Sequence, residues 1–231
     1  MKMWVVPALL AAAATVIPTA AHADVVARWQ MNEGRGASVM GDSAAAGGAN
    51  KGRIVSVRTG ARGLVSGRSY RFNGATSYVR VRDSASLDPG NRRITLRATV
   101  RTVNRAMPDD SYDLVRKGYQ TTRGGDWKME IKRGRNHSVG RLHCVFKGVM
   151  PGGRSRTVKR VARVDIVDGR IHTVACRRTA TAVHAVVDGR VFTNRRVSGH
   201  ISNNQPVIVG AKTNGDDVLR GRLDEVRIAI G

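Results

Sequence analysis

The sequence predicts an all-β protein of the sandwich or barrel type, and three observations lead to that prediction. Apolar and polar residues alternate over many short segments from Asp24 onward, as they do in half-buried strands. Turn-forming residues separate these segments, so that about a dozen short strands are expected. Helical periodicity is nearly absent, apart from a single turn expected over residues 84–88.

The first 23 residues have the pattern of a secretory signal peptide. Lys2 precedes an apolar stretch over residues 3–17, and Ala21-His22-Ala23 fits the small-x-small site that signal peptidase cleaves. The stretch is shorter than the roughly 20 residues that span a bilayer, so an uncleaved anchor is the less favoured alternative. We therefore expect a secreted protein whose residues 24–231 form one soluble domain.

The expected strands begin with a short apolar segment around Trp29, over residues 26–31. A loop rich in Gly, Ala and Ser follows, and residues 53–57 then alternate. Residues 68–73 and 77–82 are predicted to form a hairpin, because Asn73-Gly74 between them is a strong turn signal.

The second half of the chain repeats the same alternation. A further hairpin is predicted where residues 183–187 lead into Asp188-Gly189. The two-residue period of a strand places Trp127 and Phe146 on the side that faces the core, and we expect Trp29 in the core as well. The other expected strands cover residues 94–101, 127–132, 142–146, 172–176, 206–211 and 219–230.

The two cysteines, Cys144 and Cys176, fall at inward positions of their expected strands. Export permits a disulfide, and two cysteines 32 residues apart make a poor zinc site. We predict a bridge that joins two neighbouring strands inside the core. Closing a loop of about 30 residues would contribute roughly 3–4 kcal/mol to stability.

The chain is strongly basic, with a formal net charge of +23 that comes mostly from arginine. Such a charge attracts nucleic acids, anionic polysaccharides and anionic polymers of the cell envelope. The basic residues are nevertheless scattered singly along the strands. The alternative is that the Arg- and Ala-rich composition reflects the base composition of the genome. The charge therefore predicts attraction to polyanions without selecting one partner.

Several short motifs resemble those of laminin G-like, concanavalin A-like domains and occur in the order found in that family. They begin with Trp-Gln-Met-Asn-Glu-Gly at residues 29–34 and Asp42-Ser43, and they continue through Phe72-Asn73-Gly74 and the Val-Asp-Gly of residues 187–189. They close with residues 221–228. The resemblance covers residues 24–231 and implies a two-sheet antiparallel jelly-roll sandwich.

The sequence departs from the family pattern at one position and matches it at the two cysteines. Ile171 stands where the family commonly has tryptophan, within a segment similar to its Asp-Gly-x-Trp-His strand. Cys144 and Cys176-Arg177 are similar to a secreted bacterial subgroup in which these strands are disulfide-linked. In the same segment, His172 is expected to be a structural hydrogen-bonding residue.

Catalytic chemistry is not indicated. Glycoside hydrolysis needs two carboxylates that flank the cleaved bond, and the related glucanases place them in a Glu-x-Asp-x-x-Glu run that is absent here. The glutamates of residues 24–231 are Glu33, Glu130 and Glu225. Glu130, between Lys128 and Lys132, is expected to be a solvated cross-strand partner. We predict that the protein is not an enzyme.

The resemblance implies one cofactor, a structural calcium ion. Relatives often hold it between the N-terminal segment and an Asp on the last long strand. In this sequence that residue is Asp224, with Asp42 as a second ligand and backbone oxygens near Asn32 or Glu33 completing the set. The alternative is that Asp224 is satisfied by neighbouring amides or by Arg222.

Sugar binding commonly uses exposed aromatic rings, and this chain has few. With the tryptophans expected in the core, Tyr112 and Tyr119 are the best candidates for exposed rings, and Arg123 lies in the loop beside them. The sequence thus predicts a secreted, non-catalytic binding module for a glycan, such as an acidic or cell-surface polysaccharide. The alternatives are a protein-binding or adhesive envelope domain and a nonspecific polyanion binder. Nucleic acid ranks last because no groove-reading helix or stacking platform is indicated.

Overall fold

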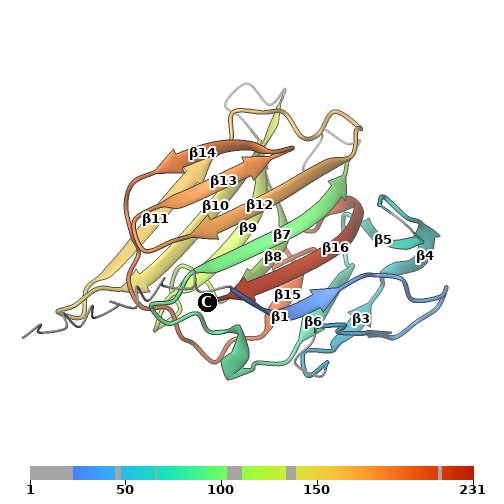
Figure 1. The fold of residues 1–231 in the computed structure, drawn as a ribbon. Coiled ribbons are helices and arrows are strands. Elements are labelled where there is room, and N and C mark those ends of the chain that lie inside the picture. Colours follow the sequence, from blue (N-terminus) through green and yellow to red (C-terminus); the bar gives the residue numbers. More distant parts are fainter. Residues whose placement is uncertain (1–22, 45–47, 66, 103–110, 134–138, 213–214) are drawn as a thin grey trace, which may run out of the picture.

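The computed structural model describes residues 23–44, 48–65, 67–102, 111–133, 139–212 and 215–231. They form two eight-stranded antiparallel sheets packed face to face (Figure 1). This arrangement confirms the expected all-β jelly-roll sandwich. The predicted signal peptide falls almost entirely outside the described residues. Within the described part, no helix is long and apolar enough to cross a membrane.

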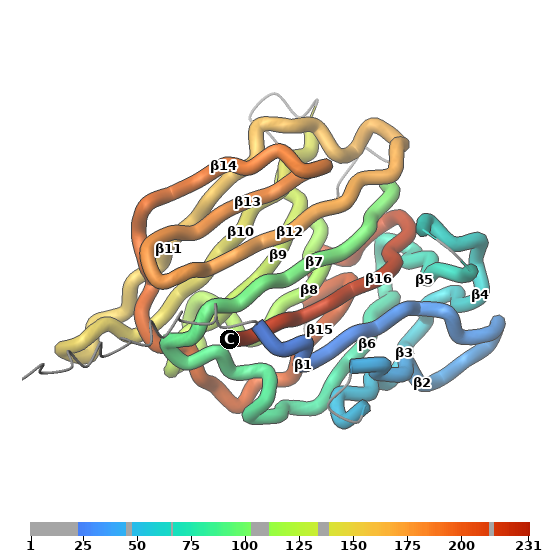
Figure 2. The backbone as a smooth tube through the Cα atoms, in the orientation of Figure 1, coloured from blue at the N-terminus to red at the C-terminus, as the bar shows by residue number. Residues whose placement is uncertain are grey.

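The first sheet contains both the first and the last strand of the described chain, which lie side by side (Figure 2). Its spatial order is β14 (Arg190–Asn194), β13 (Val183–Val187), β12 (His172–Arg178), β7 (Ile94–Arg101), β16 (Arg220–Ile230), β5 (Arg68–Asn73) and β4 (Arg58–Arg62), and β1 (Asp24–Trp29) pairs with β16.

The second sheet packs behind the first. Its order is β11 (Ser155–Val161), β10 (Gly140–Val149), β9 (Asp126–Arg133), β8 (Ser111–Lys117), β15 (Val207–Val209), β6 (Tyr78–Val81), β3 (Gly52–Val55) and β2 (Val39–Met40). A 3-10 turn, η1 (Ala85–Leu87), follows β6 where a single turn was predicted, and the Ser84 side chain caps it.

The core lies between the sheets and is filled by the apolar residues of the alternating strands. Trp29, Trp127 and Phe146 are fully buried in it, as predicted. In β7, Ile94 to Val100 alternate inward while Arg97 and Arg101 remain exposed. The alternation also fixes which basic side chains must lie on the outer face.

The disulfide joins Cys144 to Cys176, with a Cα–Cα distance of 5.3 Å. The predicted bridge is confirmed, but its position differs from the expectation. Cys144 belongs to β10 in the second sheet and Cys176 to β12 in the first. The bridge therefore crosses the core between facing sheets, because both residues point inward from opposite sides.

The hairpin predicted at Asn73-Gly74 is wrong. β5 pairs with β4 and β16 in the first sheet, whereas β6 pairs with β3 and β15 in the second. Asn73 Oδ1 accepts hydrogen bonds from the N–H groups of Ala75, Thr76 and Ser77. This side chain supports a wider arch that carries the chain from one sheet to the other.

The hairpin predicted at Asp188-Gly189 is confirmed. Both residues have positive φ angles, 47° and 80°, as a tight two-residue turn requires. The turn joins β13 directly to β14.

Candidate functional site

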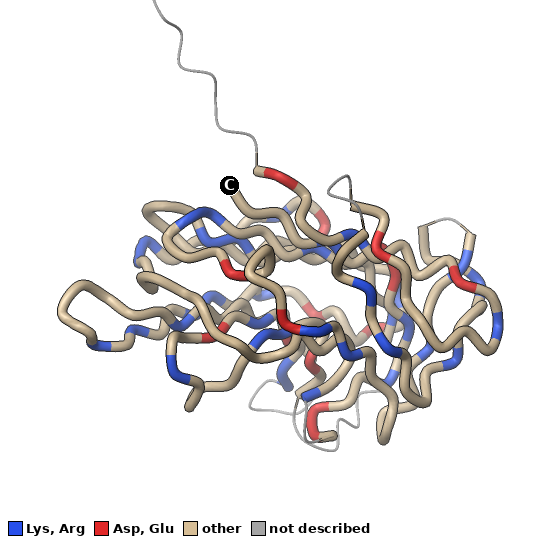
Figure 3. The backbone as a smooth tube through the Cα atoms, turned by 90° about the horizontal axis from the view of Figure 1, so that it is seen from below, with Lys and Arg blue, Asp and Glu red and all other residues tan. Residues whose placement is uncertain are grey.

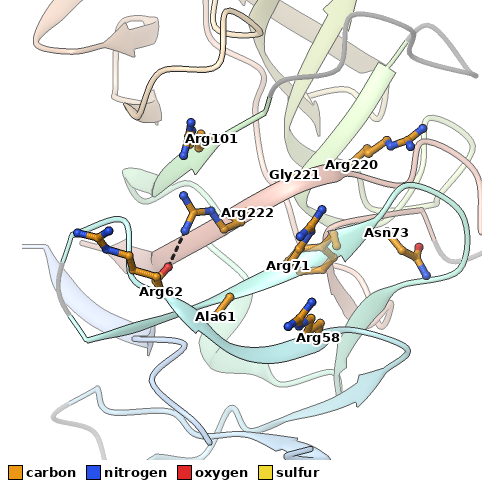
Figure 4. A pocket seen from close by; sticks show the side chains of 10 residues that line it. Arg58, Ala61, Arg62, Arg71, Asn73, Arg101, Arg220, Gly221 and Arg222 are labelled. Atoms are coloured by element: carbon orange, nitrogen blue, oxygen red, sulfur yellow. Dashed lines mark hydrogen bonds between the residues drawn. The ribbon is translucent and has the colours of Figure 1, made fainter. Parts of the chain in front are cut away.

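A groove of about 1030 Å³ opens on the outer face of the first sheet, at the ends of β4, β5, β16 and β7 (Figure 4). Arginines dominate its lining, and we call it the arginine groove. The arginines are Arg58, Arg62, Arg71, Arg101, Arg220 and Arg222.

Four of these arginines form a row across the sheet. Arg58 is the register partner of Arg71, Arg71 of Arg222, and Arg222 of Arg101. Adjacent strands are about 4.8 Å apart, so the row places one positive residue on each of four successive strands. Like charges directly opposite one another destabilise a sheet, which makes this register costly unless it serves another purpose.

Side-chain alternation directs the row outward. Tyr70 and Phe72 in β5 are buried in the core, and Arg71 between them is exposed. In β16, Leu223 is buried and Arg222 lies on the opposite face. The arginines are thus surface positions of ordinary half-buried strands.

Hydrogen bonds to backbone oxygens hold two of the guanidinium groups. Arg222 Nη1 donates to the carbonyl oxygen of Arg62 at 2.8 Å, and Arg101 Nε donates to that of Gly169 at 2.7 Å. Burial, together with the neighbouring arginines, lowers the pKa of Arg222. In the described part of the chain, none of the six arginines forms an ion pair with a carboxylate.

Arg28 shows the contrasting situation on the same outer face. It lies in β1, where its guanidinium pairs with Glu225 at 3.2 Å. The charge of Arg28 is therefore balanced by a paired carboxylate, whereas the groove arginines have no such ion pair among the described residues, and this excess of positive charge favours an anionic ligand.

Tyr112 is not an exposed ring, contrary to the sequence-based expectation. It is fully buried, opposite Ile131 in the core, and burial raises the pKa of its hydroxyl. The reason is that β8 is buried along its whole length, since the core covers one face and residues near β15 cover the other.

Tyr119 and Arg123 lie in the loop between β8 and β9. Tyr119 is half-buried, and the Arg116 guanidinium lies 4.6 Å from its ring centroid. Arg123 is exposed. Neither residue lines the arginine groove, so their predicted role in ligand binding stays a prediction.

The carboxylates of Asp42 and Asp224 each accept three backbone hydrogen bonds. Asp42 accepts from Arg28, Ala44 and Asn50. For Asp224, the donors are the N–H groups of Leu64, Val65 and Glu225. Burial raises the pKa of Asp224.

Calcium requires several oxygen ligands, whereas N–H donors surround these two carboxylates. The described arrangement does not fit a calcium ion, and it matches the alternative in which neighbouring amides satisfy Asp224. The calcium site itself stays an untested prediction.

Glu130 is buried rather than solvated, and that expectation is wrong. It lies opposite Asp113 on the neighbouring strand, and the carboxylate oxygens of both approach Asp217 within 4.8 Å. Burial raises the pKa of Asp113 to about 6. Asp217, whose carbonyl oxygen accepts from the Asp113 N–H, lies with Ala211 and Val218 over this part of the second sheet, which the strand alternation alone could not indicate.

Each carboxylate of this buried cluster has its own cationic partner. Arg116 pairs with Asp113 at 2.5 Å, and Lys128 with Glu130 at 2.5 Å. Lys212 pairs with Asp217. The three pairs balance in charge, as buried ionic groups must, and this supports a structural role.

Comparison with known proteins identifies the family. The laminin G-type family model of the concanavalin A-like lectin/glucanases superfamily matches residues 73–229, more than half of the chain. The chain belongs to this family. The resemblance inferred from the sequence motifs is thereby confirmed.

Solved structures of this superfamily fold are similar at low sequence identity. Domain 4 of AbnA, an extracellular arabinanase from Geobacillus stearothermophilus solved with arabinotriose, is 17% identical, covering 90% of this chain and 93% of that one, with a TM-score of 0.63. The binding domain of paraclostridial mosquitocidal protein 1 is also 17% identical, covering 89% and 48%, with a TM-score of 0.57.

Domains LG4-5 of the mouse laminin alpha1 chain are 17% identical, covering 74% and 44%, with a TM-score of 0.53. At these identities the likeness shows a shared fold. The chain spans about half the length of the toxin domain and of the laminin fragment. Comparison with curated protein sequences finds no match.

Proposed function

We propose that this chain is a non-catalytic binding module for an anionic polysaccharide, which it holds in the arginine groove. The observation that carries the proposal is the row of four arginines in register, none of which forms an ion pair with a described carboxylate. A guanidinium group donates two parallel hydrogen bonds to a carboxylate or sulfate, so each arginine of the row suits an anionic sugar substituent.

The direction of the row favours a linear ligand. The arginines follow one another across the strands at the strand spacing, about 4.8 Å. A polymer with recurring anionic groups can therefore contact several of them at once when it lies across β4, β5, β16 and β7. A small anion would use only part of the groove.

A binding role is also favoured over hydrolysis by the composition of the groove. Among the described residues that line it there is no aspartate or glutamate, and hydrolysis of a glycosidic bond needs a pair of them. The carboxylates Asp113, Glu130 and Asp217 are buried and held in ion pairs, away from the groove.

The comparisons support the same class of function. The similar structures include a domain solved with arabinotriose and a toxin binding domain, so this fold serves binding in other proteins. Proteins that share one fold bind many different ligands. The support for an anionic ligand therefore comes from the arginine groove and not from the structural similarity. Secretion, as the first 23 residues predict, would place the groove where such polymers occur.

The test is titration calorimetry with polygalacturonate and with neutral arabinan at about 50 and 200 mM salt. We expect the anionic polymer to bind and to weaken steeply with salt, because counterions are released on binding. Arg71→Ala should lower affinity about tenfold, the value of one hydrogen-bonded ionic contact.

Arg156→Ala is the matched control, because it removes the same charge from an exposed position of β11 in the other sheet. It should leave the affinity nearly unchanged. Equal losses in the two variants would mean that net charge alone drives binding, as in a nonspecific polyanion binder. Tight, salt-independent binding of arabinan would overturn the proposal in favour of a neutral-sugar site elsewhere.

A further inference from the structure

A second hollow of about 450 Å³ adjoins the arginine groove and shares Arg62, Arg101 and Arg222 with it. Its other lining residues are apolar or glycine. Among them, Val65 is 62% exposed and Ile171 is 49% exposed, and these are two of the four exposed large apolar side chains in the described part of the chain. Single exposed apolar residues are common on protein surfaces, but two that flank three arginines form an amphipathic pocket.

In the wall that carries Val65, hydrogen bonds hold the backbone of Leu64 and Val65. The N–H groups of Leu64 and Val65 both donate to Asp224 Oδ2, at 2.9 and 3.2 Å. Gly63 N–H donates to the Gly67 carbonyl at 3.0 Å across the same loop. Asp224 is therefore a positioning residue for this wall.

The opposite wall, with Ile171, is fixed by separate contacts. His172 lies between Asp188 and Asp168, with ring nitrogen to carboxylate distances of 2.7 and 2.9 Å. Gly169 both donates to the Thr102 carbonyl and accepts from Arg101 Nε. The backbone beside both apolar side chains is thus held by hydrogen bonds, which reduces the entropy lost on binding.

We infer that this pocket accepts an acyl substituent of the anionic polysaccharide, such as an O-acetyl group. The acyl methyl group would pack against Val65 and Ile171, while Arg62, Arg101 and Arg222 contact the carbonyl oxygen and the neighbouring anionic group. A stacked sugar ring is less suited, because Phe72, the only aromatic residue among the described lining of the two hollows, is buried. The inference rests on the proposed function and adds the chemical class of the sugar substituent.

The experiment compares O-acetylated polygalacturonate with the same polymer after chemical de-acetylation, at constant salt. We expect the wild-type protein to prefer the acetylated polymer about fourfold, the value of burying one methyl group. Ile171→Ser should lower the affinity for the acetylated polymer to that of the wild-type protein for the de-acetylated one. Val191→Ser, at a similarly exposed position in β14, is the matched control and should keep the preference.

The outcomes separate the two proposals. Failure of both polymers to bind would contradict the proposed function and with it the inference. Equal binding of both polymers, still reduced by Arg71→Ala, would overturn the acyl pocket alone. Binding of anionic lipid vesicles in place of either polymer would overturn both and assign the amphipathic pocket to a lipid. Because Val65 and Ile171 are exposed, thermal melts of the variants should match the wild type.

Discussion

Arg71 occupies the centre of the arginine row, with Arg58 and Arg222 as its register partners on either side. We expect Arg71→Ala to raise the free energy of unfolding of the ligand-free protein by a few tenths to about 1 kcal/mol, because it removes two like-charged cross-strand pairs. Urea unfolding at low salt measures this gain, which should disappear at about 1 M salt as the charges are screened. A loss of stability instead would show that Arg71 makes favourable contacts that outweigh the repulsion.

His172 is held between two carboxylates, as the structural role predicted for it requires. Burial alone would lower the pKa of His172, but the hydrogen bonds to Asp168 and Asp188 outweigh it and raise that pKa. The pKa is then higher in the folded than in the unfolded chain. The resulting stabilisation is fully present below about pH 6.5 and is lost as the pH rises through the folded-state pKa.

Chemical unfolding between about pH 6 and pH 9 tests this linkage. The free energy of unfolding of the wild type should fall over this range. In His172→Gln, the part of this fall that comes from the titration of His172 should be absent. His184→Gln is the control, since the described partner of the His184 ring is the uncharged Thr193 hydroxyl. Identical pH profiles for the wild type and His172→Gln would contradict the shifted pKa.

Asp224 and Asp42 also give a prediction, which concerns calcium. Because N–H groups surround both carboxylates, we expect chelator to leave the melting temperature of the protein unchanged. A melting temperature that falls with chelator and recovers with calcium would instead support the ligand set that the family resemblance implied.

Among the elements, β16 combines two of the groove arginines with a bulge. Its first half pairs with β5 and β7 and its second half with β1 and β7, and the register shifts between Asp224 and Arg227. Glu225 within the bulge has a φ angle of 50°. Bulges redirect side chains, and here the bulge coincides with Asp224, which anchors the loop that carries Val65.

The arch between β5 and β6 depends on Gly74, whose φ angle is 75°. A Cβ atom there would lie 2.7 Å from that of Arg220. Gly74→Ala should therefore cost more than the roughly 1 kcal/mol of the backbone strain alone and should also displace Arg220. Gly152→Ala is the control in urea unfolding, because Gly152 has a similar φ angle of 87° and open space around it. Equal costs for the two variants would show that Arg220 yields without penalty.

Strand positions could be predicted from the sequence because alternation is a local property, but strand neighbours could not. Asn73-Gly74 correctly marked a change of direction, yet the Asn73 side chain builds an arch between sheets. The outward positions of Arg71 and Arg101 were equally readable. Their place in one row depends on β5, β16 and β7 becoming adjacent, which no local pattern encodes.

At the scale of the whole molecule, the disulfide connects the two sheets. Cys144→Ala combined with Cys176→Ala should lower the free energy of unfolding by roughly 3–4 kcal/mol, mainly because the unfolded chain gains freedom. Polysaccharide affinity should persist where the variant is folded, since β10 and β12 contribute nothing to the lining of the groove. Urea unfolding and thiol titration provide the measurements. Unchanged stability, with two free thiols in the wild type, would contradict the bridge.

The net charge of the molecule was readable from the sequence, but its distribution was not. Lys and Arg occur along strands of both sheets (Figure 3), which agrees with the scatter seen along the chain. Separate arginines on separate strands nevertheless meet in the groove, so scatter in sequence did not imply scatter in space. Buried polar residues were hidden in the same way, since Tyr112 and Glu130 lie beneath cover that only the tertiary structure supplies.

The groove is built from residues that lie far apart in the sequence, and this has a practical consequence. Arg62 and Arg222, which share a hydrogen bond, are 160 positions apart in the sequence. The guanidinium groups converge only after β4, β5, β7 and β16 have assembled, a set of long-range pairings that forms late and slowly in sheet proteins. A misfolded chain keeps the same net charge but lacks the groove, so the difference in affinity for the anionic polysaccharide between folded and misfolded chains would measure how much of the binding depends on the assembled groove.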